Sequence, residues 1–553
     1  MRKSIIFLFI FLLIISQLVF SQTISSQLYE NEEDIEEGFL SGDLTYQEYL
    51  ELLDLLREGV AFNSPQKDRL LFLPDLSQSE IDQTPDTSSD IYLSEINLRT
   101  YPVAKSFFLP EMLNQTQGRV SIQSRQRFDQ NQSYNFILTE FKLKNKLRFN
   151  IQLQKEGSSD PLIKKRWLEL SSFPFLKRVV LGNFDKKIGL GLNIGYHPLL
   201  KGEELHKENY FLYPLYGRYN GLLIESKMNF FSPELILSKI RKSDYSEELW
   251  ALNLQFSNRG LNFGILRSEG SLRNLSNHSS FYDRNSSFYL KVKKEKIGFA
   301  GEYSLLNNGG KGWASILTLK DKSYLLELSG WSYTDNYLHL FGAGLSNPDY
   351  TYITIDEVEY EYPSREIGEK GIMLKSDYLL YNNLLLNFSY SQWRENNDAP
   401  FKLRQKIGLK ITLSEKIKTG FEYLYSDYDL EDEGQAQNLF TSTLLFEPQK
   451  ESSFRLITRY GKRRLSSSTN QKNSFELQLR SDLGWFSPFL LILWVRYKDS
   501  DLSLAKNGYW DLRIQESFSL FQGSLFKGEY FIKFNSVERN KVQGAKFWLE
   551  VGF

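Results

Sequence analysis

The residue types that most often carry out chemistry in proteins are scattered in this sequence. Its four histidines, His197, His206, His278 and His339, stand singly, and no two of them have metal-ligand spacing on one structural element. Cysteine is absent, which excludes thiolate metal sites, disulfides and a cysteine nucleophile. No serine stands in a nucleophile elbow or in a serine-histidine-carboxylate set. We therefore expect no catalytic, metal-binding or cofactor-binding residue.

An acidic cluster is the densest group of potential metal ligands. Asp356, Glu357, Glu359 and Glu361 lie within the stretch 341–370. Carboxylate oxygens are ligands that hard divalent cations prefer. The same residues are also typical of a solvated loop face, which we favour. Over the whole chain 67 basic residues balance 68 acidic ones, so the composition gives no general capacity to capture a polyanion.

The elements that would position such residues are β-strands. Apolar and polar residues alternate in 147–154 and again in 250–256, and the same period of two recurs from Gly118 to the end of the sequence. That period is typical of strands with one apolar and one polar face. Aromatic residues make up 15% of the chain, a share that suits the interfacial girdles of a membrane barrel better than a soluble core.

The end of the sequence carries the clearest strand pattern. Apolar side chains stand at every second position from Ala545 to Phe553, with Lys546, Glu550 and Gly552 between them. This ending resembles the closing strand of Gram-negative outer-membrane β-barrels, whose terminal aromatic residue is read by the barrel-assembly machinery. The resemblance implies that this machinery and outer-membrane lipid are partners, and that the assembly signal consists of Phe547, Leu549, Val551 and Phe553.

The stretches between the strands sort by length. Tight turns at 258–260, 294–296 and 482–485 alternate with longer polar loops, among them 267–286 and 341–370. Outer-membrane barrels have tight turns at the periplasmic rim and long loops at the outer rim. The alternation therefore predicts a mainly-β fold, in which residues 118–553 form a transmembrane antiparallel β-barrel of about 24 strands, within roughly 22–26.

Polar residues that alternate with the apolar ones would face the interior of such a barrel. Positive charge predominates among them, partly offset by Glu140, Glu422 and Glu529. An interior this wide holds water unless something fills it. Residues from Ile91 to Gln117 could fill it or line the periplasmic rim. The candidate lumen-lining residues are Arg125, Arg127, Lys142, Arg148, Lys291, Arg404, Arg480 and Arg513.

Glycine marks one stretch of the strand region. The segment 176–184, which contains Leu181-Gly182, is followed by Gly189-Leu190-Gly191-Leu192. This resembles a Leu-Gly-aromatic then Gly-x-Gly-Leu pattern of outer-membrane proteins that carry a helix-hairpin-helix module ahead of their barrel. No helix follows Gly191, so the glycine pair is not a phosphate-binding loop. We expect either a bend in the wall or close packing against an inward loop.

The first part of the chain differs in pattern from the strand region. Met1-Arg2-Lys3 and the apolar run from Ile5 to Phe20 predict a cleaved signal peptide over 1–21. Apolar residues at helical spacing then predict a small all-α periplasmic module over 22–82. A polar stretch follows, and we interpret 83–117 as a linker that could also serve as a plug or rim segment.

The helical module resembles the helix-hairpin-helix modules of the competence DNA-receptor type. Asn63-Ser64 match the opening of the first helix and Leu73-Pro74 match the hairpin, but Asp75 and Ser77 replace glycines that let backbone N–H groups approach a phosphate. The Asp75 carboxylate would repel that phosphate, so docking of an unknown periplasmic partner is favoured over nucleic-acid binding. The candidate hairpin contacts are Asn63, Ser64, Lys67, Arg69, Asp75, Leu76 and Ser77.

Together these patterns predict an outer-membrane protein of a Gram-negative bacterium, with its helical module in the periplasm. The favoured function is that of a channel, transporter or binding scaffold for a solute or polymer, with the module docking a partner or gating the lumen. The first alternative is a DNA-uptake receptor that binds DNA through the hairpin. The second is an outer-membrane barrel hydrolase.

Overall fold

The computed structural model describes the part of the chain in which strands are predicted. The predicted signal peptide, the helical module with its candidate hairpin contacts and nearly all of the linker lie outside the described residues, as does Phe553. The described residues are 116–127, 132–143, 147–156, 160–173, 175–184, 186–195, 212, 219–226, 228, 230–241, 245–258, 260–275, 280–294, 296–321, 323–337, 339–342, 345, 349–355, 358–364, 368–381, 383–394, 397–414, 416–427, 436–449, 452–464, 471–486, 489–499, 508–518, 524–535 and 540–552.

The alternating segments form strands throughout the described region. Most of them are ten or more residues long. The strands are β1 (Thr116–Arg127), β2 (Gln132–Leu143), β3 (Leu147–Glu156), β4 (Leu162–Phe173), β5 (Leu176–Phe184), β6 (Tyr219–Ser226), β7 (Phe231–Arg241), β8 (Tyr245–Asn258), β9 (Leu261–Asn274), β10 (Ser280–Lys294), β11 (Ile297–Leu306), β12 (Lys311–Lys320), β13 (Tyr324–Tyr333), β14 (Asp349–Ile355), β15 (Val358–Ser364), β16 (Lys370–Tyr381), β17 (Leu384–Arg394), β18 (Lys402–Ser414), β19 (Ile417–Asp427), β20 (Gln437–Gln449), β21 (Ser452–Arg464), β22 (Gln471–Phe486), β23 (Phe489–Asp499), β24 (Gly508–Phe518), β25 (Ser524–Asn535) and β26 (Asn540–Gly552).

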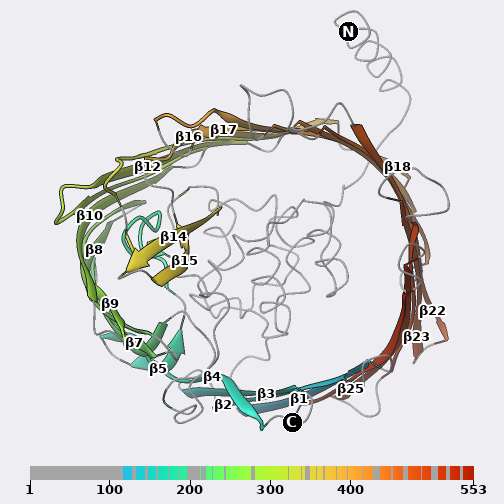
Figure 1. Ribbon diagram of the computed structural model, residues 1–553, viewed down its shortest axis with the longest axis horizontal. Helices are drawn as coiled ribbons and strands as arrows, with labels where there is room; N and C mark the ends of the chain where they lie inside the picture. The colour runs from blue at the N-terminus through green and yellow to red at the C-terminus, as the bar shows by residue number, and fades with distance from the viewer. Residues whose placement is uncertain are drawn as a thin grey trace, which may run out of the picture.

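One antiparallel sheet holds 24 of the described strands. Each strand pairs with the next one along the chain, except that β13 pairs with β16, and β14 and β15 form a separate hairpin between them. The last strand, β26, pairs with β1, with Arg119 opposite Gly552 and Arg127 opposite Gly544. The sheet thus curves into the ring seen in Figure 1. The prediction of a mainly-β, antiparallel fold is confirmed.

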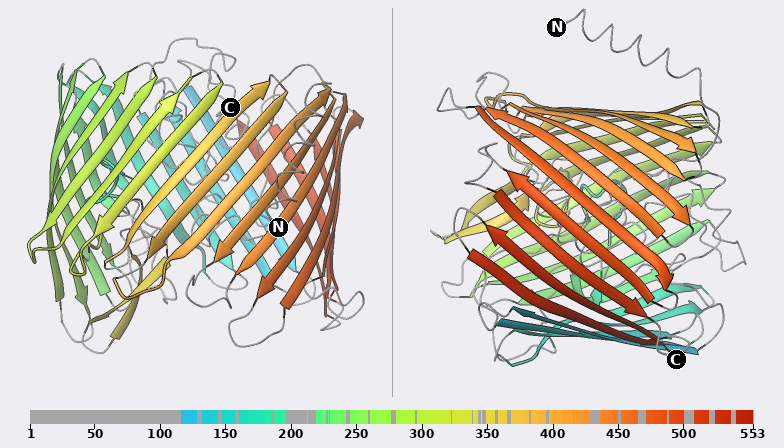
Figure 2. Two further views of the ribbon diagram at one scale, coloured as in Figure 1. Left: turned by 90° about the horizontal axis from the view of Figure 1, so that it is seen from above. Right: turned by 90° about the vertical axis from the view of Figure 1, so that its right-hand side faces the viewer.

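The connections differ in length between the two rims of the ring. The terminal rim, where β1 begins and β26 ends, has short connections such as 174–175, 295–296 and 415–416. The opposite rim, which we name the loop rim, has the longest connections, 185–218 and 334–369. The tilted strands of Figure 2 run between these two rims. The longest connections therefore lie at one rim, as the sequence predicts, although 242–244 at the loop rim is shorter than 519–523 at the terminal rim.

Two predicted connections belong to the wall. The sequence predicts a polar loop over 267–286, but these residues continue β9 and β10 as a paired hairpin whose connection is 275–279. It also predicts a tight turn over 482–485, which instead lies in β22. In both cases cross-strand pairing extends strands whose local composition favours a turn.

Burial alternates along the strands. In β12, Ala314 and Ile316 are buried inside the ring whereas Trp313 and Leu317 are exposed on its outer face. Exposed apolar residues recur on the outer face of strands far apart in the sheet, for example Leu328 in β13. A sheet embedded in lipid requires such a surface, because its strands satisfy their backbone groups by pairing and turn apolar side chains outward. None of the described residues forms a helix long and apolar enough to cross a membrane.

Candidate functional site

Lys186–Gly195, which we name the inward segment, leaves the wall and lies inside the ring (Figure 1). β5 ends at Phe184, and the next residues fold against the inner faces of β5 to β13 instead of continuing the strand. The side chains of Ile188, Leu190, Leu192 and Ile194 are at most 4% exposed. The inward segment packs closely against the wall, and Gly189 and Gly191 lie in the segment itself rather than in the wall.

One carboxylate of the wall holds the backbone of the inward segment. Glu302 in β11 accepts hydrogen bonds from the N–H groups of Leu190, at 2.7 Å, and Leu192, at 3.2 Å. Gly189 and Gly191 have φ values of 63° and 86°, a region that favours glycine, and a Cβ on Gly189 would lie 2.7 Å from a Glu302 oxygen. The glycines therefore let the backbone turn tightly and approach the carboxylate.

A second stretch, Tyr337 with 339–342, covers the inward segment. The Tyr337 hydroxyl donates to the Leu192 carbonyl at 3.0 Å, and the Gly195 N–H donates to the Phe341 carbonyl at 2.9 Å. The imidazole of His339 bridges the Asp283 carboxylate in β10 and the Asn193 carbonyl. The two stretches therefore hold each other inside the ring, although they are far apart in the sequence.

Apolar side chains fill the space between these stretches and the wall. One cluster joins Ile188 and Ile194 to wall residues such as Tyr219, Leu266 and Tyr289. A second cluster joins Leu190, Leu192 and Tyr337 to the inner faces of β11 to β13 and to Trp393 in β17. Fully burying an aliphatic side chain contributes about 1.5–3 kcal/mol. The inward segment is therefore fixed to the wall by an apolar core of its own.

Glycines in the wall make room for this core. A Cβ on Gly270 in β9 would lie 2.0 Å from the ring of Phe341, and a Cβ on Gly312 in β12 would lie 2.8 Å from the ring of Tyr337. Neither distance is compatible with the present ring positions. The absence of a side chain at these two positions is therefore what lets the aromatic rings reach the wall.

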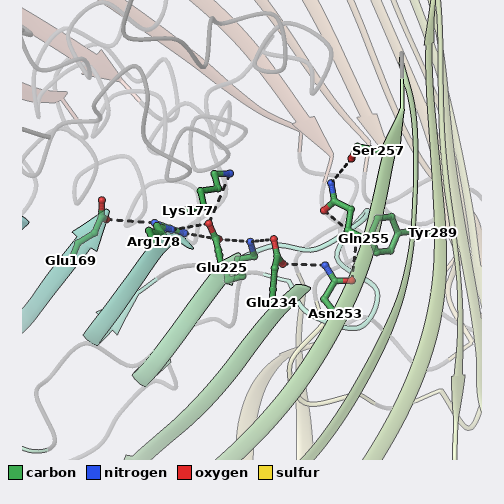
Figure 3. Close-up of polar contacts among 10 residues, drawn as sticks. Glu169, Lys177, Arg178, Glu225, Glu234, Asn253, Gln255, Ser257 and Tyr289 are labelled. Carbon is green, nitrogen blue, oxygen red and sulfur yellow. Dashed lines mark hydrogen bonds and ion pairs between the residues drawn. The ribbon is translucent and has the colours of Figure 1, made fainter. Parts of the chain in front are cut away.

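A belt of charged and polar side chains crosses the inner face of β4 to β10 beside the inward segment (Figure 3). Arg178 in β5 donates to both oxygens of Glu225 in β6, at 2.9 and 3.0 Å, and its guanidinium lies 3.6 Å from Glu169 in β4. Lys186 joins the belt from the inward segment, with its Nζ 2.6 Å from Glu225 and 3.1 Å from Glu234 in β7. Opposite charges thus couple four strands, β4 to β7, to the inward segment.

The belt continues through neutral groups. Asn253 in β8 donates to Glu234 at 3.0 Å, and the Tyr289 hydroxyl donates to Asn253 at 3.1 Å.

Burial opposes the charged form of Lys186, but the carboxylates of Glu225 and Glu234 outweigh it and raise the pKa of the Lys186 ammonium above its ordinary value. Lys186 is therefore a cation at neutral pH, although it lies inside the protein.

The arrangement occupies space inside the ring and fixes the positions of charged groups. Among the described residues, no group of three or more histidines and carboxylates is placed to hold a metal ion. His339 and Asp283 pair with each other, and the second ring nitrogen of His339 contacts the Asn193 carbonyl, which is not a nucleophile. What the site does chemically is to narrow one side of the barrel interior with a segment held by hydrogen bonds, ion pairs and apolar packing.

The candidate lumen-lining residues lie in several separate strands. Arg148, Lys291 and Arg404 are half-buried on the inner faces of β3, β10 and β18, and Arg513 in β24 is buried. None of these four takes part in the belt of Figure 3. The backbones of Arg125, Arg127, Lys142 and Arg480 lie in β1, β2 and β22, and their side chains lie outside the described ones.

The residues expected to form the assembly signal are in the last strand. Phe547 is 50% exposed on the outer face of β26, and Leu549 and Val551 alternate with it on that face. Residues 91–115, expected as a filler or rim segment, lie outside the described part of the chain. The described interior is filled on one side by a different segment, 186–195.

Sequence reasoning does not find the residues that form the candidate site. Glu302, Glu225 and Lys186 are not among the predicted residues, and His339 is noted only as one of four scattered histidines. The only signal is Gly189-x-Gly191, because two closely spaced glycines in an apolar alternation indicate backbone that approaches another group. It marks the inward segment but not its partners.

Known proteins give little guidance. No family model and no curated protein matches the sequence. Among solved structures, the siderophore receptor PirA from Pseudomonas aeruginosa is 8% identical, with 81% of each chain covered and a TM-score of 0.46. The E. coli P pilus tip assembly intermediate PapC-PapD-PapK-PapG is 9% identical over 80% of this chain and 61% of the other, with a TM-score of 0.48. OccK8 (OprE) from P. aeruginosa is 11% identical over 57% and 93%, with a TM-score of 0.33. Similarities this low carry no inference about function.

Proposed function

We propose that the chain is a transmembrane β-barrel of the Gram-negative outer membrane that passes or binds a solute or polymer through an interior narrowed by the inward segment. The pairing of β26 with β1, together with the outward apolar face, carries this proposal. In lipid every backbone N–H and C=O needs a partner, and a sheet that pairs its last strand with its first leaves no free edge.

The character of the inner face favours a water-soluble cargo. Inward-facing side chains that keep part of their surface exposed include Lys291, Arg404, Lys406 and Glu422. Basic and acidic groups both occur among them, so the described inner face is polar and does not have a single sign of charge. Such a surface suits hydrated solutes better than apolar ones.

The position of the start of β1 supports a periplasmic location for the predicted helical module. Thr116 lies at the terminal rim, where the short connections are, and this rim corresponds to the periplasmic side of the proposed barrel. A module over residues 22–82 would join the barrel at that rim. We therefore propose that it docks a periplasmic partner beside the entrance of the lumen.

Planar bilayer recording tests the proposal. We expect purified protein to give small, stable current steps, and Glu302→Leu to give larger or flickering steps, because that variant removes the acceptor of the Leu190 and Leu192 N–H groups. Glu422→Leu, which removes a carboxylate from the inner face of β19, is the control and should behave as native protein. Silent bilayers for native protein and Glu302→Leu, with both folded, would argue for a scaffolding barrel.

A further inference from the structure

Strands β8 to β10 extend past their neighbour at the loop rim. The last pair between β10 and β11 is Asn285 with Leu306, but β10 and β9 stay paired to Ser280 opposite Arg273. The backbone N–H of Asn307, in the connection after β11, donates to the Arg284 carbonyl at 3.0 Å. Arg284 therefore lies at the level where the shorter strand ends, which is the expected boundary of the apolar band.

Two arginines, a carboxylate and two aromatic residues meet on the outer face at this level. Glu269 in β9 accepts from the Tyr282 hydroxyl at 2.8 Å and from the Trp250 indole N–H at 3.3 Å. Arg267 and Arg284 contact its other oxygen at 3.3 and 3.2 Å. We name these five residues the outer cluster. Both guanidiniums are about half exposed, so each keeps N–H groups for a ligand.

Other charges around the outer cluster are mostly positive. Arg241 in β7 and Arg273 in β9 are exposed beyond it, whereas Lys239 pairs with Glu248. The carboxylate of Glu269 repels an anion, but it is shared by two guanidiniums, so the cluster keeps one net positive charge. The described outer face of β7 to β10 near the loop rim therefore carries more positive than negative charge.

The adjoining strands differ. The outer ends of β11 and β12 present Tyr303, Leu305 and Trp313, and Lys311 is the one charged residue on the outer face of these two described strands. The outer cluster is therefore a local feature of β8 to β10 and does not recur as a uniform property of the rim.

Apolar residues on the same strands continue from the outer cluster toward the terminal rim. Ile265 precedes Arg267 on the outer face of β9 and is 54% exposed, and Phe288 lies opposite it on β10 and is 49% exposed. An amphiphile with an anionic head could thus place its head on the arginines and its chains on this apolar face. Arginine suits the head because its planar fork binds phosphate oxygens in pairs.

We propose that the outer cluster binds the phosphate group of an anionic glycolipid of the outer leaflet, with the acyl chains of that lipid lying along Ile265 and Phe288. Trp250 and Tyr282 flank the phosphate, where aromatic residues with a polar edge are favoured at membrane interfaces. The inference rests on the proposed membrane embedding, but it does not depend on passage through the lumen.

Native mass spectrometry of the protein in neutral maltoside micelles tests the proposal, with lipid A as the probe. We expect one lipid A to stay bound, and Arg267→Gln/Arg284→Gln to weaken binding by about tenfold or more, because it removes two charge-assisted contacts. Lys311→Gln, which removes one exposed charge from a neighbouring strand, is the control and should bind as native protein. Equal binding by the native protein and the double variant would overturn the proposal.

Three further arms identify the source of any binding. Dephosphorylated lipid A should bind about as weakly as the double variant does, and inorganic phosphate alone should not displace the lipid at millimolar concentration. Retention of the dephosphorylated lipid with native affinity would contradict a phosphate site. Flotation with neutral vesicles is measured in parallel. If the protein floats with the vesicles but does not bind lipid A, only the lipid site is refuted. If it does not float, the proposed membrane embedding is refuted.

Discussion

Polar side chains bind different partners in two parts of the inner wall. On β5 to β13, which we name the occupied wall, Glu302 accepts backbone N–H groups and Gly270 leaves space for a ring. On β18 to β26, which we name the paired wall, ion pairs join neighbouring strands to each other. Lys406 lies 3.0 Å from Glu422, and Lys546 lies 3.3 Å from Glu529. On the occupied wall the Arg178–Glu225 pair also joins neighbouring strands, but Lys186 of the inward segment joins that pair.

The comparison shows which features of a wall mark a segment held inside. Small residues and carboxylates without a basic neighbour in the sheet leave room and hydrogen-bonding capacity that a loop backbone can use. Side chains of opposite charge on adjacent strands use that capacity among themselves. If this is right, damage to the occupied wall should release the inward segment, whereas equivalent damage to the paired wall should stay local.

The largest expected effect is at Arg178. Arg178→Leu leaves Glu225 and Glu169 buried with less compensating charge, and breaking a buried ion pair from one side costs about 3–5 kcal/mol. Lys186 and Lys177 remain near Glu225, which favours the lower end of that range. Urea unfolding in neutral detergent measures the change. A loss below the resolution of that measurement would show that the belt does not stabilise the segment.

A glycine in each wall gives the next comparison. Gly270→Ala places a Cβ 2.0 Å from the Phe341 ring, whereas the nearest atoms to a Cβ on Gly420 in β19 are 3.9 Å away. Overpacking typically costs about 1–3 kcal/mol, so we expect that loss for Gly270→Ala and almost none for Gly420→Ala. The same unfolding assay reports both variants.

A second substitution separates crowding from other causes. Phe341→Leu in the Gly270→Ala background removes the ring edge that the new methyl group meets, so the two changes should cost less together than their sum. Strict additivity would mean that Gly270 and Phe341 do not interact. The absence of a side chain at Gly270 would then not be explained by packing against the stretch 339–342.

Local patterns in the sequence were sufficient for the wall but not for what the wall holds. Alternation in 147–154 predicts β3 because each strand satisfies the same rule independently of the others. Ile188, Leu190, Leu192 and Ile194 alternate in the same way, yet they lie inside the ring. The pattern cannot separate the two cases, because an apolar side chain is buried equally well in lipid and in an internal core.

Long-range partners explain the remaining failures. Glu302 accepts a hydrogen bond from the Leu190 N–H, although the two residues are 112 positions apart in the sequence. No sequence feature near either residue indicates its partner. The stretch 267–286 is predicted as a polar loop, although most of it lies in β9 and β10. Pairing between β9 and β10 decides the outcome there, and it is visible only once both strands are placed.

The charge of Lys186 gives a smaller effect with a defined pH dependence. The carboxylates of Glu225 and Glu234 raise its pKa in the folded protein, so the protonated form stabilises the fold. That contribution is complete below the ordinary lysine value of 10.5 and is lost as the pH rises through the higher folded value. The native protein should unfold at a higher urea concentration than Lys186→Met. The difference between the two midpoints should stay constant up to about pH 10 and decrease above it.

The smallest effect is expected in the paired wall. Lys406 and Glu422 are each about one-fifth exposed, and an ion pair that reaches solvent contributes roughly 0–1 kcal/mol. Lys406→Gln should therefore lower the unfolding free energy by less than about 1 kcal/mol, and 1 M salt should remove much of the difference because salt screens exposed charges. In bilayers the variant should keep native current steps, since Lys406 and Glu422 lie on β18 and β19 whereas the inward segment packs against β5 to β13. A gain in conductance equal to that of Glu302→Leu would show that the two walls act as one unit and would end the distinction between them.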